Sequence, residues 1–262
     1  MKRVFRDQNG RRNTFFVFPA GQLPLDPGPI FLRYNAGVIK KRKEAQTMKR
    51  TELVFILDMS GSMEGLTDDT IGGFNSILKE QAGKEGEVLV TSYVFNNTAR
   101  MIHDRLPIGS VKPMTRDDYR ASGCTALLDA IGDAIHHIVG IHRYARKEDL
   151  PEQTLFVITT DGMENASHRY SAERVKEMIR HEKEKYGWEF LFLAANIDAA
   201  ETARTYGIDA DHAVDYIPDG CGTSVVYETM NNAIHSARCG RPLAADRSWR
   251  READRDFQKR KK

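Results

Sequence analysis

The sequence predicts an α/β fold: a Rossmann-like three-layer sandwich with a mostly parallel central sheet, one antiparallel edge strand and helices on both faces. From Glu52 onward, short apolar runs alternate with longer amphipathic segments of helical periodicity, which is the pattern of strands and the helices that cover them. The chain has 262 residues, 40% of them hydrophobic, and no evident repeat, so it can bury one sizeable core. We therefore expect a single folded domain with flanking segments.

The same pattern predicts the order of the elements. We expect strands at 52–58, 87–95, 98–103, 154–160, 188–194 and 212–216. We expect helices at 68–81, 125–145, 171–186, 198–206 and 223–237. The strand that ends at Phe95 is followed by Asn96-Asn97 and a second short run, which predicts a hairpin and makes 98–103 the antiparallel edge strand.

Oxygen-bearing side chains gather where two of these strands end and one helix begins. Asp58, Ser60 and Ser62 follow the first apolar run at alternate positions, Thr125 opens a helical segment, and Asp161 follows another buried strand. Because ligands bind beyond the carboxyl ends of parallel strands, we expect these residues to converge. Two carboxylates and three hydroxyls are hard donors that suit Mg²⁺, with Mn²⁺ and Ca²⁺ as alternatives, and they are poor ligands for zinc or copper. The set predicts a magnesium site with one position open to water or an incoming ligand.

These five residues carry a family resemblance. Asp58-x-Ser60-x-Ser62, Thr125 and Asp161 resemble the metal-ion-dependent adhesion site (MIDAS) of von Willebrand factor type A (vWA) domains, with all five positions filled by the family's residue types. The segment Ser-Gly-Cys-Thr-Ala-Leu-Leu-Asp-Ala-Ile from residue 122 is also similar to the family's Gly-Thr-Ala-Leu-x-Asp-Ala sequence. Its cysteine, at position 124, stands where a glycine is common and could make the site sensitive to oxidation. The resemblance covers about residues 51–237 and points to a stand-alone bacterial or phage protein.

The resemblance implies a binding mechanism rather than a reaction. In similar domains the hydroxyls contact the ion, which assigns Ser60, Ser62 and Thr125 as direct ligands, and the two aspartates bind directly or through water. An Asp or Glu of a partner protein then completes the coordination. Bacterial relatives often work with AAA+ ATPases, which suggests an adaptor with such a partner. A simpler interpretation, that Asp58, Ser60 and Ser62 only cap the following helix, leaves Thr125 and Asp161 unexplained.

Charge divides the chain into three segments. Residues 1–50 carry 12 Lys and Arg against 3 Asp and Glu, residues 240–262 carry 9 against 4, and the segment between them carries 18 against 30. We predict a basic, disordered leader over 1–50, a vWA domain over 51–239 and a basic, solvated tail over 240–262. Met48 stands directly before the first strand, so an alternative is that it is the native start.

Cysteine usage and hydropathy favour a cytoplasmic protein. Cys124, Cys221 and Cys239 are too few and too irregularly spaced for a disulfide framework. No stretch approaches the apolar length of a membrane span, and the run around Phe15 is broken by Pro19 before it reaches the length of a signal-peptide core. We expect no membrane contact.

Two other function classes fit the residues less well. Phosphoaspartyl phosphatases also have an aspartate at a strand end, but they carry a second Asp two residues later, where this chain has Ser60. No phosphate-binding glycine loop and no nucleophile with an adjacent base is apparent, so we expect no catalysis, with a Mg²⁺-dependent hydrolase as the alternative. The basic segments Lys40–Lys43 and Gln258–Lys262 could contact nucleic acid, but the acidic central segment argues against it.

Three polar residues follow Asp161 closely. Glu164, Asn165 and Ser167 could line the rim of the site. Asn165 is instead expected to serve a local turn, because asparagine bonds readily to nearby backbone.

Overall fold

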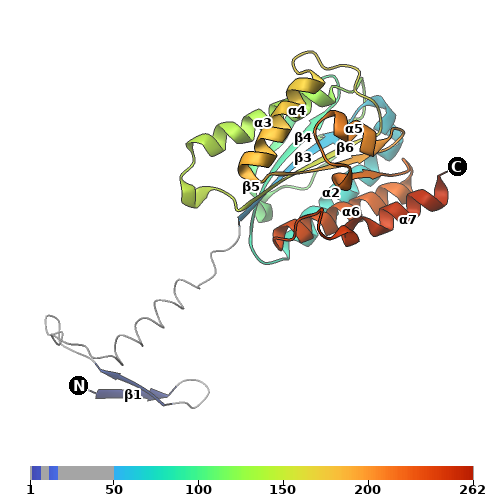
Figure 1. Cartoon of the computed structure of the whole chain (residues 1–262). Helices are drawn as coiled ribbons and strands as arrows, with labels where there is room; N and C mark the ends of the chain where they lie inside the picture. Colours follow the sequence, from blue (N-terminus) through green and yellow to red (C-terminus); the bar gives the residue numbers. More distant parts are fainter. Residues whose placement is uncertain (1, 7–11, 17–49, 262) are drawn as a thin grey trace. The chain divides into compact units, whose positions relative to one another are not determined.

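The computed structural model describes residues 2–6, 12–16 and 50–261, and the chain divides into two units, Met1–Thr47 and Met48–Lys262. The second unit contains a six-stranded sheet in the order β5-β4-β3-β6-β7-β8 (Figure 1). Its strands are β3 (Arg50–Asp58), β4 (Glu87–Phe95), β5 (Ala99–Pro107), β6 (Gln153–Thr160), β7 (Glu189–Ala194) and β8 (Ala213–Asp215). All neighbouring strands pair in parallel except β4 and β5, so the predicted fold class is confirmed.

Helices cover both faces of the sheet (Figure 1). One face carries α2 (Thr67–Ala82), α6 (Gly220–Arg238) and α7 (Arg251–Arg260), and the other carries α3 (Leu127–Tyr144), α4 (Ala172–Tyr186) and α5 (Ala199–Thr205). Short 3-10 turns lie at η1 (Gly61–Leu66), η2 (Ile108–Ser110), η3 (Lys147–Asp149), η4 (Ala210–His212) and η5 (Arg247–Arg250).

The central strand β3 contributes to both hydrophobic cores. Leu53, Phe55 and Leu57 pack with α2 and α6, whereas Val54 and Ile56 pack with α3 and α4. All five side chains are fully buried. Because a parallel strand covered on both faces has no solvent side, its sequence is a continuous apolar run rather than an alternation.

Every strand and helix predicted within 51–239 is present, with small differences in the bounds. The strand β5 runs to Pro107 rather than 103, continuing through an irregular pairing with β4 and a positive φ at Arg105. Helix α6 begins at Gly220 rather than 223, because the Asp219 side chain accepts a hydrogen bond from the Gly222 N–H and caps the earlier turn.

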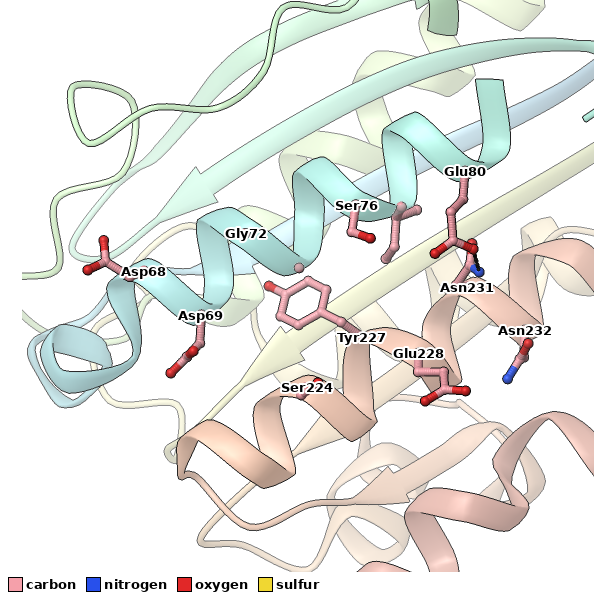
Figure 2. Close-up of a pocket in the computed structure, with 12 residues that line it drawn as sticks. Asp68, Asp69, Gly72, Ser76, Glu80, Ser224, Tyr227, Glu228, Asn231 and Asn232 are labelled. Atoms are coloured by element: carbon pink, nitrogen blue, oxygen red, sulfur yellow. Dashed lines mark hydrogen bonds between the residues drawn. The ribbon is translucent and has the colours of Figure 1, made fainter. Parts of the chain in front are cut away.

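Helices α2 and α6 approach closely because α2 carries a glycine at their contact. A Cβ atom on Gly73 would lie 2.3 Å from the Tyr227 ring of α6. Figure 2 shows Tyr227 lying against α2, in a groove that is also lined by acidic side chains of both helices. At the far end of this groove, Asn231 donates a hydrogen bond to Glu80. The glycine therefore fixes how near the two helices lie.

The segment after α6 packs against the domain, so the expected solvated tail over 240–262 is wrong for its apolar residues. Leu243, Trp249 and Ala253 are buried and join the core cluster that contains α6. The Trp249 indole N–H also donates to the Leu243 carbonyl at 3.0 Å. Three apolar side chains spread among many basic residues give little periodicity, which is why the sequence did not predict η5 and α7.

The first unit contains two described strands, β1 (Lys2–Arg6) and β2 (Arg12–Phe16), which pair in antiparallel fashion. Their valine and phenylalanine content favours β structure. Both strands lie within the segment 1–50 that was expected to be a disordered leader, and that assignment stays a prediction. Arg50, the last residue of the predicted leader, belongs to β3, and the remaining residues, including Lys40–Lys43, lie outside the described part of the chain. Among the residues described, no helix is both long and apolar enough to span a bilayer.

Candidate metal site

The topology of the sheet brings two predicted ligands to one edge. Strands β3 and β6 are adjacent and parallel, with Leu57 opposite Thr159, so Asp58 and Asp161 emerge together at their carboxyl ends. The chain passes from β3 to β4 on one side, while β6 lies on the other, which makes this a point where the strand order reverses. Crevices for ligands form at such points in open α/β sheets.

Three of the predicted residues form a row of oxygen atoms. The Ser60 and Ser62 hydroxyl oxygens lie 3.1 Å apart, and Ser62 Oγ donates to Asp161 Oδ1 at 2.6 Å. Ser60 and Asp161 are buried, whereas Ser62 is exposed. The exposed Ser62 hydroxyl therefore lies between two buried residues, so the row reaches the surface at its middle member.

Asp58 is fully buried behind this row, and both of its carboxylate oxygens accept hydrogen bonds. Oδ1 accepts from the Ser60 N–H and Oδ2 from the Thr160 hydroxyl, each at 2.7 Å. Burial raises the pKa of Asp58 above its ordinary value, the bonds from Thr160 and Ser60 oppose this, and the charge of Asp161 adds to the rise. Two carboxylates in one buried site thus favour a nearby positive charge.

The loop that carries Thr125 is fastened to the loop after Asp58 by backbone hydrogen bonds. The Gly61 N–H donates to the Gly123 carbonyl at 3.0 Å, and the Ser122 N–H donates to the Met59 carbonyl at 2.9 Å. Thr125 is 4% exposed, and its hydroxyl oxygen lies 4.0 Å from where a Cβ of Gly162, the residue after Asp161, would be. Thr125 is therefore held beside the Asp161 loop.

Asn165 and Glu164 position the Thr125 segment. Asn165 Oδ1 accepts from the Thr125 N–H at 2.9 Å, and the Asn165 N–H donates to the Thr125 carbonyl at 3.1 Å. The expectation that Asn165 serves a local turn is wrong, because its partner lies 40 residues away. The Glu164 carboxylate accepts from Leu128 N–H at 2.9 Å and from the Ser167 hydroxyl at 2.7 Å. It thereby satisfies a free N–H in the first turn of α3.

Three residues that the sequence did not single out also support the site. Thr160 holds Asp58, and its place directly before Asp161 at a strand end was the available signal. The Tyr119 hydroxyl donates to the Asp58 carbonyl, and Asn196 Nδ2 donates to the Asp161 carbonyl at 3.0 Å. Nothing in the sequence pattern indicated these last two contacts.

The oxygens of the row are at hydrogen-bond distances, which are also close to the ligand spacing of a hard divalent ion. Neighbouring ligands of an octahedral Mg²⁺ with bonds of about 2.1 Å lie about 3 Å apart, and the oxygens of Ser60, Ser62 and Asp161 are 3.1 and 2.6 Å apart. Within 2–6, 12–16 and 50–261, no group of three or more His, Cys, Asp or Glu could hold a metal. A site here thus depends on hydroxyls, and its assignment to a metal stays a prediction.

Comparisons with known proteins agree with this fold. The family model "VWA domain containing CoxE-like protein" matches residues 34–201, well over half of the chain and including all five predicted ligands. No curated protein matches.

Solved structures of low sequence identity share the fold. The pilus adhesin SpaC of Lactobacillus rhamnosus GG, in its open conformation, has a TM-score of 0.55 and 13% identity, with 73% of this chain and 31% of that chain covered. The vWF domain of the pilus tip protein Mfa5 from Porphyromonas gingivalis has a TM-score of 0.51 and 8% identity, covering 73% of this chain and 97% of that one.

Proximal thread matrix protein 1 from the mussel byssus is also similar, and one of its structures has a zinc-occupied MIDAS motif. Its TM-score is 0.48 at 15% identity, with 70% of this chain covered. The chain spans 45% of the length of that protein.

Proposed function

Because the chain belongs to the family of VWA domain containing CoxE-like proteins, we propose that it is an intracellular adaptor that binds a partner protein through Mg²⁺ held at a MIDAS. One observation carries the proposal. Oxygen atoms of Ser60, Ser62 and Asp161 form a closely spaced row at the strand ends, which is exposed at Ser62 and has the fully buried Asp58 behind it.

Each residue would have a distinct role toward the ion. Ser60, Ser62 and Thr125 would supply hydroxyl oxygens, and Asp161 would supply a carboxylate oxygen. Asp58 would balance the charge and hold Ser60, because both of its oxygens are engaged with neighbouring groups. When bound, the ion supplies a positive charge with a free coordination position, which suits an Asp or Glu side chain of the partner.

The surface around the site suits a protein partner. Met163 lies two residues after Asp161 and is 72% exposed, so an apolar side chain stands at the rim beside the polar row. Exposed methionine next to polar groups is typical of protein interfaces. Among the described residues Cys124, Cys221 and Cys239 are free and exposed, which supports a reducing compartment such as the cytoplasm. By family resemblance, an AAA+ ATPase is the proposed partner class.

Metal binding is tested first, without a partner. Mg²⁺ should raise the unfolding temperature of the wild type, since a ligand at 100 times its dissociation constant adds about 2.7 kcal/mol to the stability of the folded state. Thr125→Ala and Asp161→Asn should lose this shift. Ser76→Ala, which removes an exposed hydroxyl from α2, should keep it.

Partner binding is tested next by affinity capture from the source cell with and without EDTA. We expect partners that are captured by the wild type and by Ser76→Ala, and that are lost with EDTA or with Thr125→Ala. Capture that persists unchanged under all of these conditions would reject the metal bridge, even if the domain binds Mg²⁺.

A further inference from the structure

A second cavity lies where β6 and β7 begin, at the opposite strand ends from the candidate metal site. It has a volume of about 410 Å³ and lies between the end of α3, the segment before β6 and the end of α4. Val139, Leu150, Tyr186 and Trp188 line it together with polar groups. This size falls within the range of small-molecule sites, which are mostly apolar with a few placed polar groups.

One wall of the cavity is aromatic from the core to the surface. Trp188 is 5% exposed and stacks on Phe156, with ring centroids 5.3 Å apart. Tyr186 lies 6.5 Å from Trp188 and is 57% exposed, at the mouth. A flat ligand entering past Tyr186 would therefore meet the Trp188 ring.

The cavity also contains a buried carboxylate without a partner. Glu182 is 5% exposed, and its Oε2 has no hydrogen-bond partner within the described part of the chain. Its Oε1 lies 3.9 Å from His181 Nε2, beyond hydrogen-bond distance. Leaving a buried carboxylate oxygen unpaired is costly, so such groups are usually satisfied by a partner or a ligand.

The other basic side chains around Glu182 and the cavity, two of which line it, are engaged with other groups. His142 Nε2 lies 2.6 Å from Glu52 Oε2. Lys185 Nζ lies over the Tyr186 ring, and Arg143 lies over the Tyr144 ring. Burial raises the pKa of Glu182, and the charges of His181, Lys185 and His142 lower it only in part.

We infer that this cavity binds a guanidinium group, with Glu182 accepting its N–H groups and the Trp188 ring lying against its plane. A guanidinium fits better than an ammonium, because it is planar, stacks on aromatic rings and is more weakly hydrated, so its burial costs less. Glu152 at the rim adds a second negative charge. The group could come from a small free guanidine or from an arginine side chain of a partner protein.

Two matched pairs of probes test this inference. Butylguanidinium is compared with the neutral butylurea, and a capped Gly-Arg-Gly tripeptide with its citrulline equivalent. Binding is followed by calorimetry and by the two indole N–H signals of the protein in NMR spectra, because the chain has two tryptophans. We expect the guanidinium probes to bind and to shift the Trp188 signal while the Trp249 signal stays constant.

Glu182→Gln should weaken the binding of both guanidinium probes by about tenfold or more, since it removes a charge-assisted hydrogen bond. Glu173→Gln, an exposed change on the same helix, should leave it unchanged. Without ligand, Glu182→Gln should unfold at the same or a higher temperature than the wild type. If the carboxylate had a purely structural role, the substitution would lower the unfolding temperature. Tighter binding of the tripeptide would identify a partner arginine, and tighter binding of butylguanidinium a free ligand. Equal binding of the urea probes, no binding, or indifference to Glu182→Gln would overturn the inference, and none of these outcomes depends on Mg²⁺.

Discussion

Replacing Asn165 by alanine should weaken metal binding while the domain stays folded. Asn165 makes two hydrogen bonds to Thr125, one through its side chain at 2.9 Å and one through its backbone N–H at 3.1 Å. The substitution removes only the first. Thr125 is 4% exposed, so its N–H would lose its partner in a largely buried place. We expect the free energy of unfolding to fall by about 1–3 kcal/mol.

The effect on the metal follows from the role of Thr125. Removing a group that orients a metal ligand typically lowers affinity by about 10–100-fold, which corresponds to roughly 1.4–2.7 kcal/mol. If the Thr125 hydroxyl is a ligand, the dissociation constant of Mg²⁺ should rise by that factor in Asn165→Ala.

Calorimetric titration with Mg²⁺ and urea unfolding of the same samples measure the two effects separately. Asn165→Asp is the matched control, because it keeps an oxygen that can accept from the Thr125 N–H. It should bind Mg²⁺ at least as tightly as the wild type. A loss of stability in Asn165→Ala with an unchanged Mg²⁺ affinity would refute the assignment of Thr125 as a ligand.

Three further predictions concern the scaffold. Gly73→Ala places a methyl group 2.3 Å from the Tyr227 ring and should lower the free energy of unfolding in urea by about 1–3 kcal/mol. Gly72→Ala is the matched control, because its methyl group would meet nothing within 4 Å, and it should be neutral or stabilising. Equal effects of the two substitutions would contradict the close helix contact. Burial raises the pKa of Asp129, but hydrogen bonds from three backbone N–H groups outweigh it and hold that pKa below its ordinary value. Its stabilisation is therefore present above about pH 4 and lost as the pH falls through the folded-state pKa. Asp129→Asn should cost about 2 kcal/mol at pH 7 and progressively less as the pH falls below about 4, and a cost independent of pH would count against this. Trp249→Ala should cost about 3–5 kcal/mol in thermal or urea unfolding, because this indole is 3% exposed; a cost below about 1 kcal/mol would mean that the segment after α6 is solvated after all.

The elements that the sequence predicted are those with strong local patterns. The apolar run of β3 is continuous because both faces are covered. Helix α3 buries a stripe of regularly spaced apolar residues, and α4 buries Val175 and Ile179 four residues apart. The parallel order followed from the alternation of these elements, and the strand ends then placed Asp58 and Asp161 at one edge. Helix α7 has one buried residue, Ala253, so its contact with the domain left almost no pattern in the sequence.

The supporting contacts of the candidate site could not be predicted, because they join residues far apart in the chain. Glu164 bonds to the first turn of α3, and Asn165 to Thr125, across separations of 36 and 40 residues. Tyr119 reaches the Asp58 carbonyl from 61 residues away. An isolated Glu, Asn or Tyr in a loop carries no periodic signal of such a partner, and only the folded topology brings them together.

The structure also shows how the loop accommodates Cys124 directly before Thr125. The two loops of the site meet through the hydrogen bond from Gly61 to Gly123, and the left-handed conformation needed there lies at Gly123, with φ +78°. A Cβ on Gly123 would lie 2.0 Å from Asn97 Oδ1, so this position requires glycine. Cys124 has no positive φ, its side chain is exposed, and its N–H donates to the same Asn97 oxygen at 3.1 Å. The loop therefore requires glycine at residue 123 only. A side chain at residue 124 does not change the backbone conformation that positions Thr125.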